Sequence, residues 1–365
     1  MAKRTDDIYE DGIGRTSIFD AEPPAEADLW FLAPPPEDSA PTDMPWPMAA
    51  RQASLDPDLW RDAEARCYRG LLDAAQAVAR FGERLRRCPE GAVRRIALRS
   101  VAAALHGEGT WLPPEQIALY QVLRIGADDS ARDLARAGWA VRRLCGGAGA
   151  PGPLDGLHGF LGRDTVQNPQ APPGEDRPVG AELDLLGDRW AAAVAALADL
   201  HPLTRAAYGF AVWRGEALTP WDDLLEPAVA AMLVGAGGLA PFLPLAVGHR
   251  LDRGALAPGP EAVQARLAQF LAAAEAGALA ALRDLARLID WAARAGAATA
   301  DLSGKTPPAL IDALTRFPVV SAELVAETAG CSRPAARRNL ALFTRCGLIR
   351  EITGQDRYRF WTVAA

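Results

Sequence analysis

The sequence has few cysteines and histidines, and neither residue type falls into a pattern. The five cysteines show no C-x-x-C spacing, and an odd, scattered set does not make a disulfide framework. Reduced thiols in a cytoplasm fit this usage better, so we predict a cytoplasmic protein. The four histidines have no metal-ligand spacing, and we expect neither a bound metal nor any other cofactor.

The sequence also lacks an unbroken apolar run long enough to cross a membrane. The 22 residues from Pro227 to Gly248 carry no charge, which is about the length of a spanning helix. They contain GAGGLAPFLP, however, and its glycines and prolines would interrupt a helix. We therefore expect two buried elements joined by a turn, and no contact with a membrane.

An overall positive charge is missing too, since the formal net charge is −7. The charge is nevertheless unevenly placed along the chain. Residues 1–50 carry three basic and eleven acidic side chains, a balance of −8, whereas residues 305–365 carry nine basic and five acidic ones, a balance of +4. Attraction to phosphate is screened within about 10 Å. The local positive charge of the C-terminal residues therefore tells more about binding to nucleic acid than the negative net charge of the whole chain does.

Helical patterns dominate the chain, so we predict a mainly α fold. Apolar residues follow helical spacing from Asp58 to Leu85, and a long amphipathic helix is expected from Glu261 to Arg294, with Leu267, Leu271, Leu279 and Leu282 on one face. Acidic and proline-rich sequence at the start predicts disorder. The predicted parts are a disordered acidic arm (1–50), an N-terminal helical region (51–145), a Gly/Pro-rich linker or long loop (146–182), a second helical region (183–300) and a C-terminal domain (305–365).

The C-terminal residues predict a winged helix-turn-helix. A short helix begins near Pro308, Ser321 is placed to cap a second, and Ser332 to cap a third that runs from Arg333 to Cys346. The segments LIREI and RYRFWTV then flank TGQD, which is typical of a β-hairpin with a four-residue loop. Three helices followed by a hairpin make a winged helix.

A helical wheel separates the two faces of the third helix. Ala336, Leu340 and Phe343 fall on one side and should pack inward, whereas the other side is small or basic. Such a face suits the major groove of double-stranded DNA, with the wing touching phosphates. The predicted DNA-contacting residues are Ser332, Arg333, Arg337, Arg338, Arg345, Arg350, Arg357 and Arg359. The alternative is a solvated basic face on a winged domain that binds other proteins.

Two segments resemble an uncharacterised bacterial family that carries a C-terminal helix-turn-helix and is typical of alphaproteobacterial chromosomes and plasmids. The first is HGEGTWLPPEQIALYQVLRIGADDSARDLARAGWAVRRL, residues 106–144, and the second is the run from Ser321 to Trp361. Their order and spacing also agree, so the resemblance covers most of residues 50–365. It implies a DNA-bound role on a bacterial replicon, such as regulation of transcription.

That family is similar in layout to Fic proteins, helical enzymes that transfer AMP to hydroxyl groups and often end in a winged helix. Their motif is H-P-F-x-D/E-G-N-G-R-x-x-R, and its best match here retains Pro220, Trp221 and Asp223. Thr219 stands at the position of the basic histidine, and Leu224 to Pro227 stand at the phosphate-holding turn. Glu108 and Gly109 resemble the remnant of the Fic regulatory motif.

The resemblance therefore implies a Fic-like helical body without the chemistry, because a threonine cannot serve as general base. We expect no catalytic residue, and we name Thr219, Pro220, Trp221 and Asp223 as a degenerate motif. The alternative function is a divergent nucleotidyl transferase that uses other residues in a pocket near Thr219. The sequence leaves open whether two chains form a homodimer.

Overall fold

The computed structural model describes residues 54–89, 91–123, 130–146, 151–162, 177–247, 251, 259–355 and 358–364. The predicted acidic arm (1–50) lies outside them. Within this part the chain is mainly α, with thirteen α-helices and one small sheet of three strands at the C-terminus. The predicted fold class is confirmed at that level.

The first helical segment is two helices, where the apolar spacing from Asp58 to Leu85 predicted one. These are α2 (Pro57–Arg66) and α3 (Tyr68–Arg86). Asp56 caps α2 by accepting a hydrogen bond from the backbone N–H of Asp58 at 3.0 Å. At Cys67 the backbone leaves helical geometry (φ −92°, ψ 13°), which ends α2 and lets α3 start in a new direction.

The rest of the body is built from two groups of three helices. The segment after residue 90 forms α4 (Gly91–Glu108), α5 (Pro114–Leu123) and α6 (Ala131–Leu144). Pro114 opens α5, where its missing N–H costs nothing, because the first N–H groups of a helix have no partner within the helix. The second half of the body consists of α8 (Gly180–Ala196), α9 (Pro202–Gly215) and α10 (Leu225–Val234). Both halves share one hydrophobic cluster, so they do not form separate cores.

The linker or loop predicted over 146–182 is wrong for residues 151–162. This stretch forms a 3-10 turn (η3, Pro153–Asp155) and the short helix α7 (Leu157–Leu161). Leu157, Phe160 and Leu161 are buried in the body core, and the burial of three large apolar side chains outweighs the turn-forming composition around them. Residues 147–150 and 163–176 of the predicted loop lie outside the described part.

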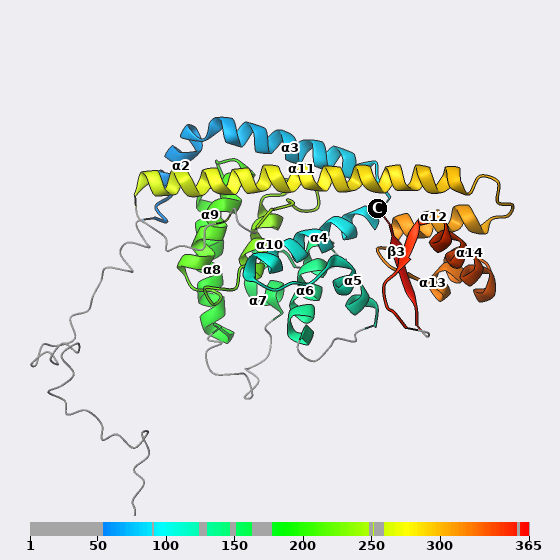
Figure 1. Cartoon of the computed structure of the whole chain (residues 1–365). Coiled ribbons are helices and arrows are strands. Elements are labelled where there is room, and N and C mark those ends of the chain that lie inside the picture. Colours follow the sequence, from blue (N-terminus) through cyan, green and yellow to red (C-terminus); the bar gives the residue numbers. More distant parts are fainter. Residues whose placement is uncertain are drawn as a thin grey trace, which may run out of the picture. The chain divides into compact units, whose positions relative to one another are not determined.

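One long helix, α11 (Pro260–Ala298), extends beyond α3 toward α12 (Figure 1), and it contributes to two hydrophobic cores. Val263, Leu267 and Phe270 belong to the core of the body, where α11 packs against α2, α3 and α9. Farther along, Leu288 and Trp291 belong to the core of the C-terminal domain. The predicted leucine face is correct for Leu267 but not for Leu279, which is 36 % exposed, because α11 turns a different side to each core.

Length and composition alone would allow α11 to cross a membrane, which holds for no other helix in the described ranges. Core helices meet the same criterion, and the apolar side chains of α11 are packed against neighbouring helices. The uncharged stretch after Pro227 is α10 followed by irregular backbone in which Phe242, Leu243 and Leu245 are buried.

The C-terminal domain is a winged helix, as the sequence predicted. Its elements are α12 (Thr306–Arg316), β1 (Val320–Ser321), α13 (Ala322–Thr328), α14 (Arg333–Arg345), β2 (Ile349–Glu351) and β3 (Phe360–Val363). The strands are antiparallel in the order β1-β3-β2, with Val320 opposite Trp361 and Ile349 opposite Val363. The sequence did not predict β1, because two residues are too few to show an alternating pattern.

Buried polar groups tie the winged helix to the body. The indole of Trp291 donates to the carbonyl of Leu348 at 2.7 Å, and both partners are buried. The guanidinium of Arg95 in α4 donates to the carbonyls of Thr315 and Phe317 at the end of α12, where helix carbonyls lack internal donors. At Gly91 a Cβ would lie 1.6 Å from the carbonyl oxygen of Arg316, so only glycine allows this approach.

Replacing Trp291 with Phe keeps an aromatic ring at the junction but removes its donor to Leu348. We expect Trp291→Phe to lower the free energy of unfolding by about 1 kcal/mol, the net contribution of one hydrogen bond, because the carbonyl of Leu348 still accepts from the N–H of Ala364 at 3.0 Å. Trp111→Phe is the control, because Trp111 is 74 % exposed, and it should change stability by less than about 0.5 kcal/mol. Urea unfolding followed by circular dichroism measures both. Equal stability of the two variants would contradict the role given to this bond.

Candidate functional site

The helix-turn-helix forms because local capping residues stop and start its two helices. Ser321 accepts a hydrogen bond from the N–H of Leu324 at 3.1 Å and so caps α13. Gly330 adopts φ +58° in the turn, a conformation that favours glycine. Ser332 caps α14 by accepting from Ala335 N–H at 3.4 Å, and Pro334 occupies the first turn. The hydroxyl of Ser332, which was predicted to contact DNA, therefore stabilises the first turn of α14 in this structure.

Helix α14 buries one face and exposes the other. Ala336, Leu340 and Phe343 are fully buried in the winged-helix core, as the wheel predicted. Arg337 and Arg338 lie on the exposed side. The burial of one apolar stripe therefore fixes which side chains of α14 can meet a partner.

The exposed arginines of α14 differ in how they are paired. Arg333 forms an ion pair with Glu323 in α13, so part of its charge is already compensated. Arg337, Arg338 and Arg345 are exposed, and no carboxylate in the described ranges forms an ion pair with them. These three side chains are the ones that can offer all their donors to an incoming anion.

The wing gives a mixed result for the predicted contacts. Arg350 in β2 pairs with Glu115 of α5 at 2.7 Å, so this predicted contact residue faces the body. Arg359 is exposed beside β3, and Arg357 lies outside the described residues. Glu351 shapes the start of the wing loop by accepting from the N–H groups of Thr353 at 2.7 Å and Gly354 at 3.1 Å.

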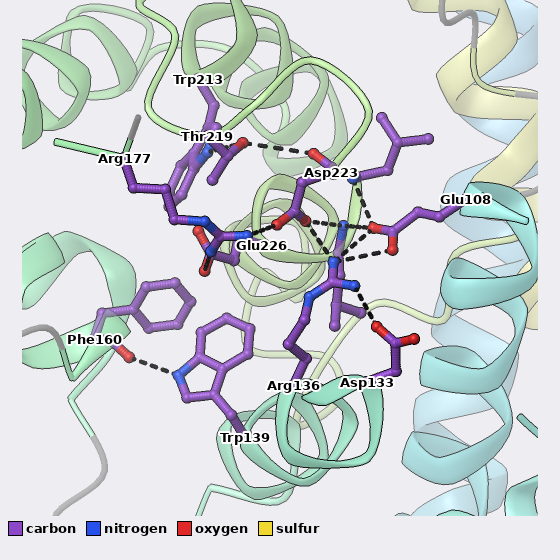
Figure 2. Close-up of polar contacts among 12 residues, drawn as sticks. Glu108, Asp133, Arg136, Trp139, Phe160, Arg177, Trp213, Thr219, Asp223 and Glu226 are labelled. Atoms are coloured by element: carbon purple, nitrogen blue, oxygen red, sulfur yellow. Dashed lines mark hydrogen bonds and ion pairs between the residues drawn. The ribbon is translucent and has the colours of Figure 1, made fainter. Parts of the chain in front are cut away.

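A second cluster of charged residues lies inside the body, where segments far apart in sequence meet (Figure 2). Arg136 of α6 contacts Glu108 at 2.9 Å and Asp223 at 2.8 Å, and Asp223 also pairs with Arg177. Arg177 in turn contacts Glu226 at 2.7 Å. The side chains of Glu108 and Asp223 are each 6 % exposed, so their charges depend on these arginines.

This cluster contains the residues that the sequence named as degenerate motifs. Glu108 and Asp223 share Arg136, so the two motif segments do meet in space. Pro220 is half-buried, and Gly109 ends α4 with φ +93°, a conformation that favours glycine. Sequence reasoning missed Arg136, which lies 87 residues from Asp223 and carries no local signal of that pairing.

The groups of the cluster that a Fic-type reaction would use are already engaged in hydrogen bonds within the protein. Glu108 accepts from the N–H groups of Leu224 at 2.7 Å and Leu225 at 2.6 Å, the donors that a phosphate would use at the start of α10. Burial raises the pKa of Glu108, against the opposing effect of Arg136. The Thr219 hydroxyl is buried and accepts from the indole of Trp213 at 3.3 Å.

The last member of the degenerate motif, Trp221, points another way. Its side chain is 42 % exposed, and the guanidinium of Arg214 lies 3.8 Å from the ring centroid. This stacking is a cation–π contact that orders the surface of the loop before α10. Asp223 of the same motif points inward instead, and its carboxylate is buried between two arginines.

Replacing Arg136 with Met should leave Glu108 and Asp223 buried without their shared partner. We expect Arg136→Met to lower the free energy of unfolding by about 3–5 kcal/mol, the range for breaking a buried ion pair. Arg142→Met on the same helix is the matched control, since Arg142 is exposed, and it should cost less than about 0.5 kcal/mol. Thermal or urea unfolding measures both, and a stable Arg136→Met would mean that the cluster does not hold the body together.

The comparison with protein families concerns only the C-terminal domain. Residues 307–364 match the family model described as an HTH DNA binding domain. No curated protein matches the chain. The family match does not reach the body, so it gives no support to the resemblance with Fic proteins or to an alphaproteobacterial origin. The chain is a mainly α protein that ends in a helix-turn-helix domain, and this domain indicates DNA as its partner.

Proposed function

We propose that this protein binds double-stranded DNA through α14 of its winged helix and acts there as a regulator of transcription. One observation carries the proposal. Within the segment that matches an HTH DNA binding domain, the exposed side of α14 holds Arg337, Arg338 and Arg345 without internal ion pairs in the described part of the chain.

The proposed contacts follow from the geometry of the grooves. The major groove is about 12 Å wide and admits one helix, whose first turns reach the base edges. Arg337 and Arg338 lie in the first half of α14 and are assigned to guanine edges and neighbouring phosphates. Arg345 at the end of α14 and Arg359 beside β3 are assigned to phosphates alone.

Two of the predicted contact residues are expected to contribute less to the affinity for DNA. Arg333 and Arg350 are held by Glu323 and Glu115, and each pair would have to open before the arginine could contact DNA. Breaking such a pair offsets part of the gain from a phosphate contact, since exposed pairs contribute about 0.2–1 kcal/mol.

The regulatory role rests on the way the body is joined to the winged helix. Because α11 supplies side chains to both cores, a change in the packing of the body acts on the domain proposed to hold DNA. We do not extend the proposal to AMP transfer. The buried hydroxyl of Thr219 cannot act as a base, and Glu108 occupies the backbone donors at α10.

The double variant Arg337→Ala with Arg338→Ala tests the proposal. We expect it to bind duplex DNA at least about tenfold more weakly than the unaltered chain. The slope of log affinity against log salt should become shallower by about two, because each lost phosphate contact releases one counterion fewer. Fluorescence anisotropy of a labelled duplex at several salt concentrations measures both quantities.

The control is Arg294→Ala, which removes an exposed arginine of α11 that belongs neither to α14 nor to the wing. It should leave both the affinity and the salt slope unchanged. If the double variant binds as the unaltered chain does, α14 is not the DNA-reading helix. If neither the unaltered chain nor the double variant binds duplex DNA, the DNA proposal fails, and the alternative use of the winged helix is contact with other proteins.

A further inference from the structure

A cleft of about 460 Å³ lies between the body and the winged helix, and of the predicted DNA-contacting residues its lining includes Arg350 alone. Its walls come from α4, the start of α5 and α11 on one side, and from Pro318, β2 and the end of β3 on the other. A volume of this size falls in the range of small-molecule sites, about 300–1,000 Å³. The question is which ligand its chemistry would suit.

Positive charge exceeds negative charge around the cleft. Its lining holds four guanidinium groups, those of Arg95, Arg99, Arg287 and Arg350, against the carboxylates of Glu115 and Asp284. The formal balance is four minus two, or +2. A cleft of this kind attracts an anion, and a dianion would neutralise the excess.

The existing ion pairs leave the arginines under-compensated. A single oxygen of Asp284 serves both Arg99 at 3.0 Å and Arg287 at 3.5 Å. Arg350 pairs with Glu115 at 2.7 Å. The side chains of Arg99, Arg287 and Arg350 remain 52 %, 63 % and 55 % exposed, so each retains donors for a ligand.

Arg95 stands apart from the other three arginines. Its guanidinium donates to backbone carbonyls of residues 314–317, and no carboxylate in the described ranges forms an ion pair with it. Burial and the neighbouring charge of Arg99 lower the pKa of Arg95 to about 10. It therefore keeps its charge at neutral pH, and Glu115 compensates this charge only in part, without a direct ion pair.

The rest of the lining is apolar and comes from both sides of the junction. Ile96, Leu285 and Leu288 contribute from the body, and Val363 contributes from the winged helix. Ile96, Leu285 and Leu288 are nearly buried, so little of their surface faces the cleft, whereas Val363 is half-buried. A ligand with an apolar group beside its charges would cover this remaining apolar surface, which an inorganic ion would leave in water.

We propose that this cleft binds a small organic dianion, with its carboxylate or phosphate groups on the arginines and its apolar part against the leucines. The proposal does not rest on DNA binding, because the cleft and its charges are present without DNA. Carboxylate and phosphate share the bidentate geometry that arginine recognises, and separate probes distinguish the two.

The test uses isothermal titration calorimetry of the full chain with three probes at matched ionic strength. Phenyl phosphate and phenylsuccinate carry the two anionic groups, and benzyl alcohol is the uncharged counterpart. We expect one or both anions to bind at millimolar concentration and the alcohol not to bind. The stronger of the two anions identifies the group that the cleft prefers.

Variants locate the binding in the cleft. Arg287→Gln should weaken the preferred anion about tenfold, because it removes a donor and leaves Asp284 less compensated. Arg294→Gln, farther along the same helix and outside the cleft, should have no effect. Glu115→Gln should tighten binding by severalfold, since it removes a competing carboxylate, and a gain cannot come from misfolding. Absence of binding by both anions, or equal affinities in Arg287→Gln and Arg294→Gln, would overturn the proposal.

Discussion

The continuity of α11 is the constraint on which the rest of the structure depends. In a helix of 39 residues, apolar side chains of the first two-thirds are buried in the body, while Leu288, Trp291 and Ala295 are buried in the winged helix. Burial of apolar side chains in both cores therefore attaches the same helix to the body and to the winged helix. Directional hydrogen bonds add to that attachment: Trp291 is a second donor to the carbonyl of Leu348, and Arg95 donates to the carbonyl of Phe317 after the end of α12.

Charge is distributed according to burial. In the body, Arg136 and Arg177 are consumed by Glu108, Asp223 and Glu226, and this cluster binds four segments of chain to one another. On α14, in contrast, Arg337, Arg338 and Arg345 face solvent and their charge is available to a partner. The same residue type thus stabilises the fold in one place and offers a binding surface in another, and exposure decides between the two.

The sequence could predict those parts of the fold that depend on neighbouring residues. Ser321 and Ser332 act as caps within three or four positions, and Ala336, Leu340 and Phe343 repeat at helical spacing, so both features are local. Contacts between residues far apart in the sequence have no such local pattern and could not be predicted. The bond between Arg136 and Asp223, the pair of Arg350 with Glu115, and the burial of Phe160 depend on the tertiary fold. The contacts assigned to the arginines of α14 stay predictions.

Hydrogen exchange of the full chain, measured with and without duplex DNA, tests the central claim most directly. It reports which backbone amides are covered and needs no substitution. The account predicts slower exchange in α14 and in the loop between β2 and β3 when DNA is added, with the amides of α8 and α9 unchanged. Slower exchange confined to the body, with α14 unaffected, would contradict the claim that this helix holds the DNA.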